Sequence, residues 1–305
     1  MAIMTRYDFA KQIVESDLNT VFGMEYDNYA LEYPQYMDVS DVSGRRRAFE
    51  EDVLQAGLGY ASEKAEGAAF AEDAGKEAWT KRYTHRTIGM SFLLSEEAIE
   101  DNQYMDLGPK FAKSMAIGIR QTCEVYSANV INDGFDAGYP GGDGQPLFSA
   151  AHPTTHAGAQ SNLVTPADLS ETSLEEALTI VRKMKNDRGI PIMAKGKRVC
   201  GPPELMWTMR KILQTPNAPF SADNTKNVVR DAITTEECVI TNLTNPKAWF
   251  VKTDVEYGLR VFDRISVVVP KATVDDSTGN IRYRGRARRS EGWSDWRGCV
   301  GSSGA

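Results

Sequence analysis

Side chains that bind metals or act as nucleophiles are scarce in this chain. Its 305 residues include three histidines and four cysteines, and no two cysteines form a C-x-x-C pair. Cysteines this far apart cannot build a zinc ribbon or a local redox motif, and they are typical of small buried apolar side chains. We expect all four to be reduced, and we expect neither a metal site nor a cofactor. The cysteines are Cys123, Cys200, Cys238 and Cys299.

Long apolar runs and an excess of positive charge are also missing. No run of 18 apolar residues occurs, and residues 1–10 lack the apolar segment of a secretory signal. Lys and Arg number 35 against 42 Asp and Glu, which gives a net charge of -7. A dedicated nucleic-acid binder needs clustered cations, so any contact with DNA should be weak and non-specific. We therefore expect no membrane span, and synthesis in the cytoplasm.

The chain does contain enough apolar sequence for a large core. Hydrophobic residues make up 41% and charged residues 25%, an ordinary balance for a globular protein. From Pro109 to Asp133 apolar residues recur every three to four positions without a breaker, which predicts a helix of about 25 residues and roughly 38 Å. The stripe consists of Phe111, Met115, Ile119, Cys123, Tyr126 and Val130.

Later segments divide into helices and strands that do not alternate. Ser173 and Glu176 are typical of a capping box at the start of a helix that Gly189 ends, and residues 202–213 predict a second helix with prolines at its start. Short apolar or alternating runs predict strands at residues 198–200, 238–240, 249–251, 258–262, 265–269 and 281–287. The predicted fold class is α+β, with helices and strands segregated.

Two stretches cannot build a core of their own. Residues 6–19 have the spacing of a short amphipathic helix, and residues 24–42 place tyrosines among acids and Pro34, as in an extended arm. Residues 56–87 are rich in Ala, Gly, Glu and Lys, which predicts a long projecting hairpin or loop. Its acids are Glu63, Glu66, Glu72, Asp73 and Glu77. We expect residues 1–48 and 56–87 to become ordered only in an assembly.

The segment Gly141–Leu163 joins a Gly-rich turn to two histidines and invites an enzymatic interpretation. His152 and His156 have the spacing of zinc ligands on a helix, but Pro153 prevents a helix there. A Ser/His/Asp hydrolase would need the G-x-S-x-G turn, which is absent. Its other candidate side chains would be Ser149, Ser161 and Asp143. We expect no catalytic residue, and a cytosolic hydrolase that uses the His152 loop stays open as an alternative.

Arginine recurs at every second position late in the chain. Arg282, Arg284, Arg286 and Arg288 alternate with Ile281, Tyr283 and Ala287. On a strand such alternation puts all four guanidinium groups on one face, and this set is called the arginine comb below. The comb could be a solvated face, could contact DNA, or could pair with acids of a neighbouring subunit. We favour the neighbour, because the acidic stretch of residues 56–87 supplies matching carboxylates and Arg binds carboxylates through two hydrogen bonds.

Several short segments occur together in an order that resembles one known family. They are the Ala/Gly/Glu-rich stretch of residues 56–87, SEEAIEDNQY (95–104) with the long helix after it, DGQPLFSAAHP (143–153), the strand-PPEL-helix of residues 198–213, NPKAWFVK (245–252), and TGNIRYRGR with GWSDWRG (278–298). Together they resemble the major capsid proteins of tailed bacteriophages, especially the branch related to the major head subunit of phage Mu.

The resemblance implies the fold named for phage Hong Kong 97. Residues 1–48 would be the N-terminal arm and residues 49–92 the E-loop, which reaches over a neighbouring subunit. Residues 93–170 with 258–305 would form the P-domain, which contains the long spine helix, and residues 171–257 would form the A-domain.

The resemblance also implies function and partners. The protein would self-assemble into hexamers and pentamers of an icosahedral head that encloses double-stranded DNA, and it would be located in the virion. Many relatives carry an N-terminal scaffolding region, whereas here the expected E-loop follows Met1 closely, so we expect a separate scaffolding protein, together with a portal. A minor head or decoration protein is a further alternative.

Overall fold

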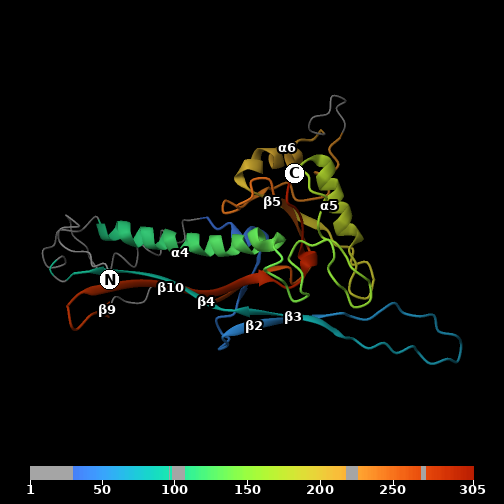
Figure 1. Ribbon diagram of the computed structural model, residues 1–305, viewed down its shortest axis with the longest axis horizontal. Coiled ribbons are helices and arrows are strands. Elements are labelled where there is room, and N and C mark those ends of the chain that lie inside the picture. Colours follow the sequence, from blue (N-terminus) through green and yellow to red (C-terminus); the bar gives the residue numbers. More distant parts are fainter. Residues whose placement is uncertain (1–29, 96, 98–106, 218–225, 269–272) are drawn as a thin grey trace.

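The computed structural model describes residues 30–95, 97, 107–217, 226–268 and 273–305. A long helix lies along the larger of two sheets, a smaller layer of helices and strands stands near one end of it, and a hairpin projects beyond the body (Figure 1). Helices and strands are segregated, which confirms the α+β class. No helix among the described residues is long and apolar enough to cross a membrane. The helix expected at residues 6–19 lies outside the described residues.

The long helix, α4 (Leu107–Asn132), is the spine predicted from the apolar stripe. Met115, Ile119 and Cys123 are buried between α4 and the larger sheet. A Cβ atom on Gly285 of the sheet would lie 2.7 Å from the Ile119 side chain, so only glycine permits the helix to lie this close. The stripe therefore faces the sheet, as the sequence predicts.

The larger sheet has the order β1-β8-β10-β4, and α4 covers one of its faces. Its strands are β1 (Asp38–Asp41), β4 (Arg86–Leu94), β8 (Leu259–Val268) and β10 (Ile281–Trp293), and the short β9 (Thr273–Val274) pairs with β10. The two strands expected between residues 258 and 269 form the single strand β8, because antiparallel pairing with β10 continues through Asp263. Strand β10 extends well past the predicted end at residue 287.

The smaller sheet has the order β11-β7-β5-β6. Its strands are β5 (Gly196–Gly201), β6 (Cys238–Val239), β7 (Trp249–Thr253) and β11 (Cys299–Ser302), and it shares a core with α5 (Glu171–Lys183) and α6 (Met206–Gln214). Three short 3-10 helices are described: η1 (Asp133–Phe135), η2 (Pro203–Leu205) and η3 (Trp296–Gly298). All four cysteines are free and buried, as expected.

The start of α5 differs from the prediction. Ser170 is the N-cap, and its hydroxyl accepts a hydrogen bond from the Ser173 backbone N–H at 3.2 Å. In return the Ser173 hydroxyl accepts from the Ser170 N–H at 2.9 Å. The capping box is therefore built by two serines, three positions earlier than the predicted pair, and the helix ends at Lys183 rather than near Gly189.

The projecting hairpin consists of β2 (Phe49–Gln55) and β3 (Glu77–Thr84), which pair along their full lengths. Residues 56–76 extend beyond it as a loop (Figure 1), as predicted. After His85 the chain enters β4, which pairs with β10 in the larger sheet. The hairpin therefore ends at Thr84 rather than at residue 87, and both strands of the hairpin are paired within their own chain.

The described part of the N-terminal region packs against its own subunit. Tyr33 and Tyr36 of α2 (Tyr33–Tyr36) and Val42 are buried, and β1 pairs in parallel with β8. The Glu124 carboxylate of α4 accepts hydrogen bonds from the backbone N–H groups of Glu32 and Tyr33, at 2.9 and 3.1 Å. The expectation that all of residues 1–48 order only in an assembly is therefore wrong for residues 31–42.

The contact between α4 and the sheet predicts the effect of a charge in the stripe. Met115 and Ile119 are almost fully buried. The variants Met115→Asp and Ile119→Asp should lose soluble folding, because each places an unpaired carboxylate in an apolar contact. Lys110→Asp, at an exposed position of the same helix, is the control and should retain the yield and melting temperature of the unmodified protein. Normal melting of Met115→Asp would mean that the stripe does not carry the core.

Candidate assembly surfaces

The arginine comb occupies the face of β10 that α4 does not cover. Tyr283, Gly285 and Ala287 are buried toward α4, whereas Arg284 and Arg286 are exposed. Arg282 and Arg288 are half-buried. The alternation predicted from the sequence is therefore present.

The neighbouring strand leaves the comb uncovered. Across β4 the direct partners of Arg284, Arg286 and Arg288 are Ser91, Gly89 and Thr87. These three residues are small, so they screen little of the guanidinium groups beside them. Arg284 and Arg286 are therefore two exposed cations on this sheet face, which is suited to carboxylates or phosphates.

The predicted acidic partners lie on the projecting hairpin. Glu63, Glu66 and Glu72 are exposed on the loop of residues 56–76, and Glu77 is exposed at the start of β3. The loop extends away from the body on the side opposite to the start of β10 (Figure 1). One chain therefore does not bring the comb and these acids together, and a contact between them would require a second copy.

Asp73 differs from the other acids, because it already has a partner in its own chain. Its carboxylate contacts the Arg188 guanidinium and accepts a hydrogen bond from the Gly59 backbone N–H at 2.7 Å. These contacts, the Gly59 bond first, hold the pKa of Asp73 below its usual value. Sequence reasoning grouped Asp73 with the comb's partners, and nothing in the spacing indicated Arg188.

The comb ends at a bulge in β10. Pairing with β8 shifts register between Arg286 and Arg288 and again between Arg288 and Arg289, and Arg289 turns into the core. Its Nε lies 2.7 Å from a Glu291 carboxylate oxygen, and its guanidinium lies over the Tyr33 ring at 4.3 Å. Burial raises the pKa of Glu291, although Arg289 opposes the shift. Arg289 was not predicted, because the sequence does not show where the alternation breaks.

A buried histidine lies at the junction of the hairpin and the larger sheet. His85 Nδ1 is 3.1 Å from the Ser290 hydroxyl, and its Nε2 is 3.9 Å from a Glu50 carboxylate oxygen. The other Glu50 oxygen accepts from Arg45 at 2.6 Å. Burial lowers the pKa of His85; Glu50 opposes the shift, and Arg264 and Arg288 add to it. No motif in the sequence marked this residue.

The Gly141–Leu163 segment forms a buried polar brace instead of a catalytic site. Asp143 binds His152 Nδ1 at 2.6 Å, and the imidazole stacks on Trp296 with ring centroids 4.4 Å apart. Asn162 Oδ1 lies 3.2 Å from His152 Nε2 and accepts from the Ser149 N–H at 3.0 Å. The Asn162 amide donates to the carbonyls of Leu147, Trp296 and Cys299.

The hydrolase arrangement is not formed. The Ser149 hydroxyl donates to the Gln145 side chain, and the Ser161 hydroxyl donates to the Leu163 carbonyl. His152 is completely buried, and both of its ring nitrogens already have partners. Among the described residues no cluster of three potential metal ligands occurs. The contacts of His152 therefore identify this loop as a structural brace.

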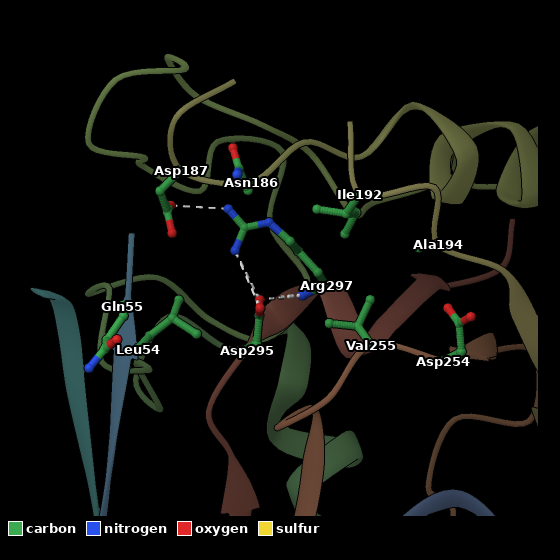
Figure 2. Close-up of a pocket in the computed structure, with 10 residues that line it drawn as sticks. All are labelled: Leu54, Gln55, Asn186, Asp187, Ile192, Ala194, Asp254, Val255, Asp295 and Arg297. Atoms are coloured by element: carbon green, nitrogen blue, oxygen red, sulfur yellow. Dashed lines mark hydrogen bonds and ion pairs between the residues drawn. The ribbon is translucent and has the colours of Figure 1, made fainter. Parts of the chain in front are cut away.

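A cavity of about 280 Å³ lies where the loop end of β2 meets the smaller sheet (Figure 2). Leu54 of β2 and Val255 lie at its walls, and Asp187 and Asp295 point toward Arg297. The buried Arg297 binds Asp187 at 3.1 Å and Asp295 at 3.2 Å. Burial raises the pKa of Asp295, and Arg297 opposes the shift. Arg297, Asp187 and Asp295 therefore brace the junction, because one guanidinium binds both buried carboxylates.

The brace generates a prediction about stability. Asn162→Ala should lower the free energy of unfolding by about 3 kcal/mol, because the two N–H groups that serve the carbonyls of Leu147, Trp296 and Cys299 would be lost together with the acceptor of the Ser149 N–H. His152→Ala should also destabilise the fold, whereas His156→Ala, at an exposed position, should not. Urea unfolding measures all three, and neither histidine variant should change any hydrolytic activity. Equal stability of His152→Ala and the unmodified protein would contradict the brace.

The junction histidine generates a prediction about pH. Because the pKa of His85 is lowered in the fold, the unfolded chain binds its proton more readily. The His85 contribution is therefore complete above the unfolded pKa, about 6.5, and decreases as the pH falls below that value until the lowered pKa is reached. His85→Gln should remove this component from a series of unfolding curves between pH 8 and pH 5. The exposed His156→Gln is the control, and an identical pH profile for His85→Gln and the unmodified protein would contradict the assignment.

Comparison with known proteins gives the family of the chain. A family model described as phage capsid protein matches residues 77–302. No curated protein sequence matches the chain.

Solved structures show the same fold at low identity. The Mycobacterium phage Patience structure has a TM-score of 0.58 and 11% identity, covering 99% of this chain and 92% of that chain. The virus-like particle from Pyrococcus furiosus has a TM-score of 0.54 and 8% identity, covering 94% and 98%. The procapsid of bacteriophage JBD30 has a TM-score of 0.50 and 14% identity, covering 94% and 74%.

The family match and the fold together show to which protein family the chain belongs. The match runs from residue 77 to residue 302, well over half of the 305-residue chain. The α+β fold of the chain is also the fold of the solved structures that it matches. The hydrolase alternative finds no support in the geometry around His152 or in the comparisons. The chain belongs to the phage capsid protein family.

Proposed function

We propose that the subunits form hexamers and pentamers whose projecting hairpins cross subunit boundaries, and that the shell encloses double-stranded DNA. The observation that carries this proposal is the loop of residues 56–76, which extends beyond the body and exposes Leu58, Tyr60 and Phe70. Large apolar side chains in such exposed groups are typical of protein interfaces. Stable assemblies bury roughly 2,000 to 5,000 Å² per interface, and a projecting arm adds such area.

The arginine comb is the proposed receiving surface for the acids of a neighbour's hairpin. Arg284 and Arg286 are exposed beside small residues, and the acids on the loop are exposed at the far side of the molecule. Arg binds carboxylates through paired hydrogen bonds, and the net charge of -7 disfavours DNA as the main partner. The proposed contacts are between Arg282, Arg284, Arg286 and Arg288 on one subunit and Glu63, Glu66, Glu72 and Glu77 on the next.

The remaining partners follow from the same proposal. Assembly would use a separate scaffolding protein and a portal, and packaged DNA would make weak, non-specific contacts with the inner surface. The protein would have no catalytic role. Residues 30–48 would be the described part of the N-terminal arm, residues 49–84 the E-loop, and the two sheets the centres of the P-domain and A-domain. The closer relation to the phage Mu branch stays a prediction.

Charge reversal tests the comb. Arg284→Glu combined with Arg286→Glu should leave the subunit folded, because both side chains are exposed, and should block shell closure. Each exposed ion pair contributes only about 0 to 1 kcal/mol, but a symmetric shell repeats it at every boundary. Adding Glu63→Lys and Glu66→Lys to the same chain should partly restore closure, as counted by negative-stain microscopy. The control is Arg230→Glu, at an exposed position outside the comb.

Two outcomes would contradict the comb contact. Normal shells that retain DNA poorly would mean that the comb faces the genome. Reversed arginines with no effect on closure or DNA would mean that the comb is a solvated face. A minor head or decoration protein would form no closed shells, even when the unmodified chain is expressed with its scaffold.

A further inference from the structure

The structure assigns Arg188 as the residue that positions the projecting loop before assembly, by binding Asp73. The latch, as we call it, consists of Arg188, Asp73 and Gly59. Asp73 therefore binds within its own subunit, whereas Glu63, Glu66 and Glu72 are exposed and available to a neighbouring subunit. Only the contact of these three acids with a neighbour rests on the proposed function.

The cation of the latch is presented by a rigid turn. The Asn186 side-chain oxygen accepts hydrogen bonds from the backbone N–H groups of Arg188 and Ile190, both at 2.9 Å. Gly189 has φ of 86°, a conformation that favours glycine, and the Asn186 N–H donates to the Ile190 carbonyl at 2.8 Å. Only 16% of the Arg188 side chain is exposed. The turn therefore fixes the backbone that carries the guanidinium, and the guanidinium itself binds Asp73 of the loop.

The turn is also tied to the braced junction beneath it. Asp187 is buried and accepts from Arg297 at 3.1 Å, and the Asp187 carbonyl accepts from the His156 N–H at 3.0 Å. The Lys185 carbonyl accepts from Arg297 Nε at 2.8 Å. Arg188 is therefore attached to the body of the subunit through Lys185 and Asp187, which precede it in the same turn.

The latch joins both limbs of the loop to that turn. Asp73 lies on the returning limb, and its carboxylate binds the N–H of Gly59 on the outgoing limb at 2.7 Å while it contacts Arg188. A Cβ atom on Gly59 would lie 3.2 Å from the Asp73 carboxylate and 3.4 Å from Arg188 Nη2, so glycine gives the room for this approach. The Ala56 N–H donates to the Lys76 carbonyl at 2.7 Å, which continues the hairpin up to the latch.

The latch gives the loop of residues 56–76 a contact with the body of its own subunit. Strands β2 and β3 are fixed to the body, since Asp52 binds Arg260 at 2.7 Å and the Trp79 indole donates to the Ser294 carbonyl at 3.1 Å, but neither contact involves the loop of residues 56–76. Arg188 adds one contact to the body at the outer end of the hairpin. The segment between Gly59 and Asp73 carries Glu63, Glu66 and Glu72, so the latch fixes both ends of the segment that contains these acids.

Hydrogen exchange on the unassembled subunit tests this inference. Arg188→Gln and Asp73→Ala should each raise exchange roughly threefold or more at the hydrogen-bonded amides of Ala56 and Gly59, without changing exchange in α4 or the melting temperature. Arg230→Gln, which removes an exposed cation outside the latch, is the matched control and should exchange like the unmodified protein. The swapped pair Asp73→Arg with Arg188→Asp should restore much of the protection.

Unchanged exchange in Arg188→Gln, or a swapped pair that stays as open as the single variants, would overturn the latch. Because the measurement uses unassembled subunits, it can be read even if no shells form. Shells that close normally while Arg188→Gln shows no change in exchange would overturn the latch and leave the proposed function standing.

Discussion

The contact between one face of β10 and the spine helix is the constraint on which the rest of the structure depends. Gly285 allows Ile119 to approach the strand, and Tyr283 is buried beside it. Because side chains alternate along a strand, burying these residues forces the arginines between them to the opposite face. The core therefore creates the cationic surface, and a change of register by one residue would exchange the two faces.

The subunit combines a braced body with attached arms. Buried ion pairs, such as Arg289 with Glu291 and Arg297 with Asp295, lie where separate segments meet. Removing one residue of such a pair leaves a buried charge without a partner, which strongly destabilises the fold. The strands of the hairpin are also fixed to the body, through contacts such as Asp52 with Arg260 and Trp79 with the Ser294 carbonyl, whereas the loop of residues 56–76 contacts the body at Arg188. A fixed hairpin that ends in a largely exposed loop suits a subunit that must meet neighbours in more than one local geometry.

Periodic features were predictable from the sequence, and long-range polar contacts were not. The stripe of α4 and the alternation of the arginine comb follow from the spacing of residues and are present as expected. The bulge that turns Arg289 inward and the pairing of Asp73 with Arg188, 115 positions away, depend on the tertiary fold. The His152 motif was conspicuous, but its partners Asn162 and Trp296 decide that it is a brace.

The central claim is that the face of β10 left free by the spine helix receives the hairpin of a neighbouring subunit. The direct measurement is a cryo-EM reconstruction of the assembled shell at a resolution that shows side chains. The account predicts carboxylates of a neighbour's loop, from Glu63 to Glu72, within about 4 Å of Arg284 or Arg286. A map in which the comb faces the enclosed DNA, or in which the neighbour's loop lies against another surface, would contradict the account.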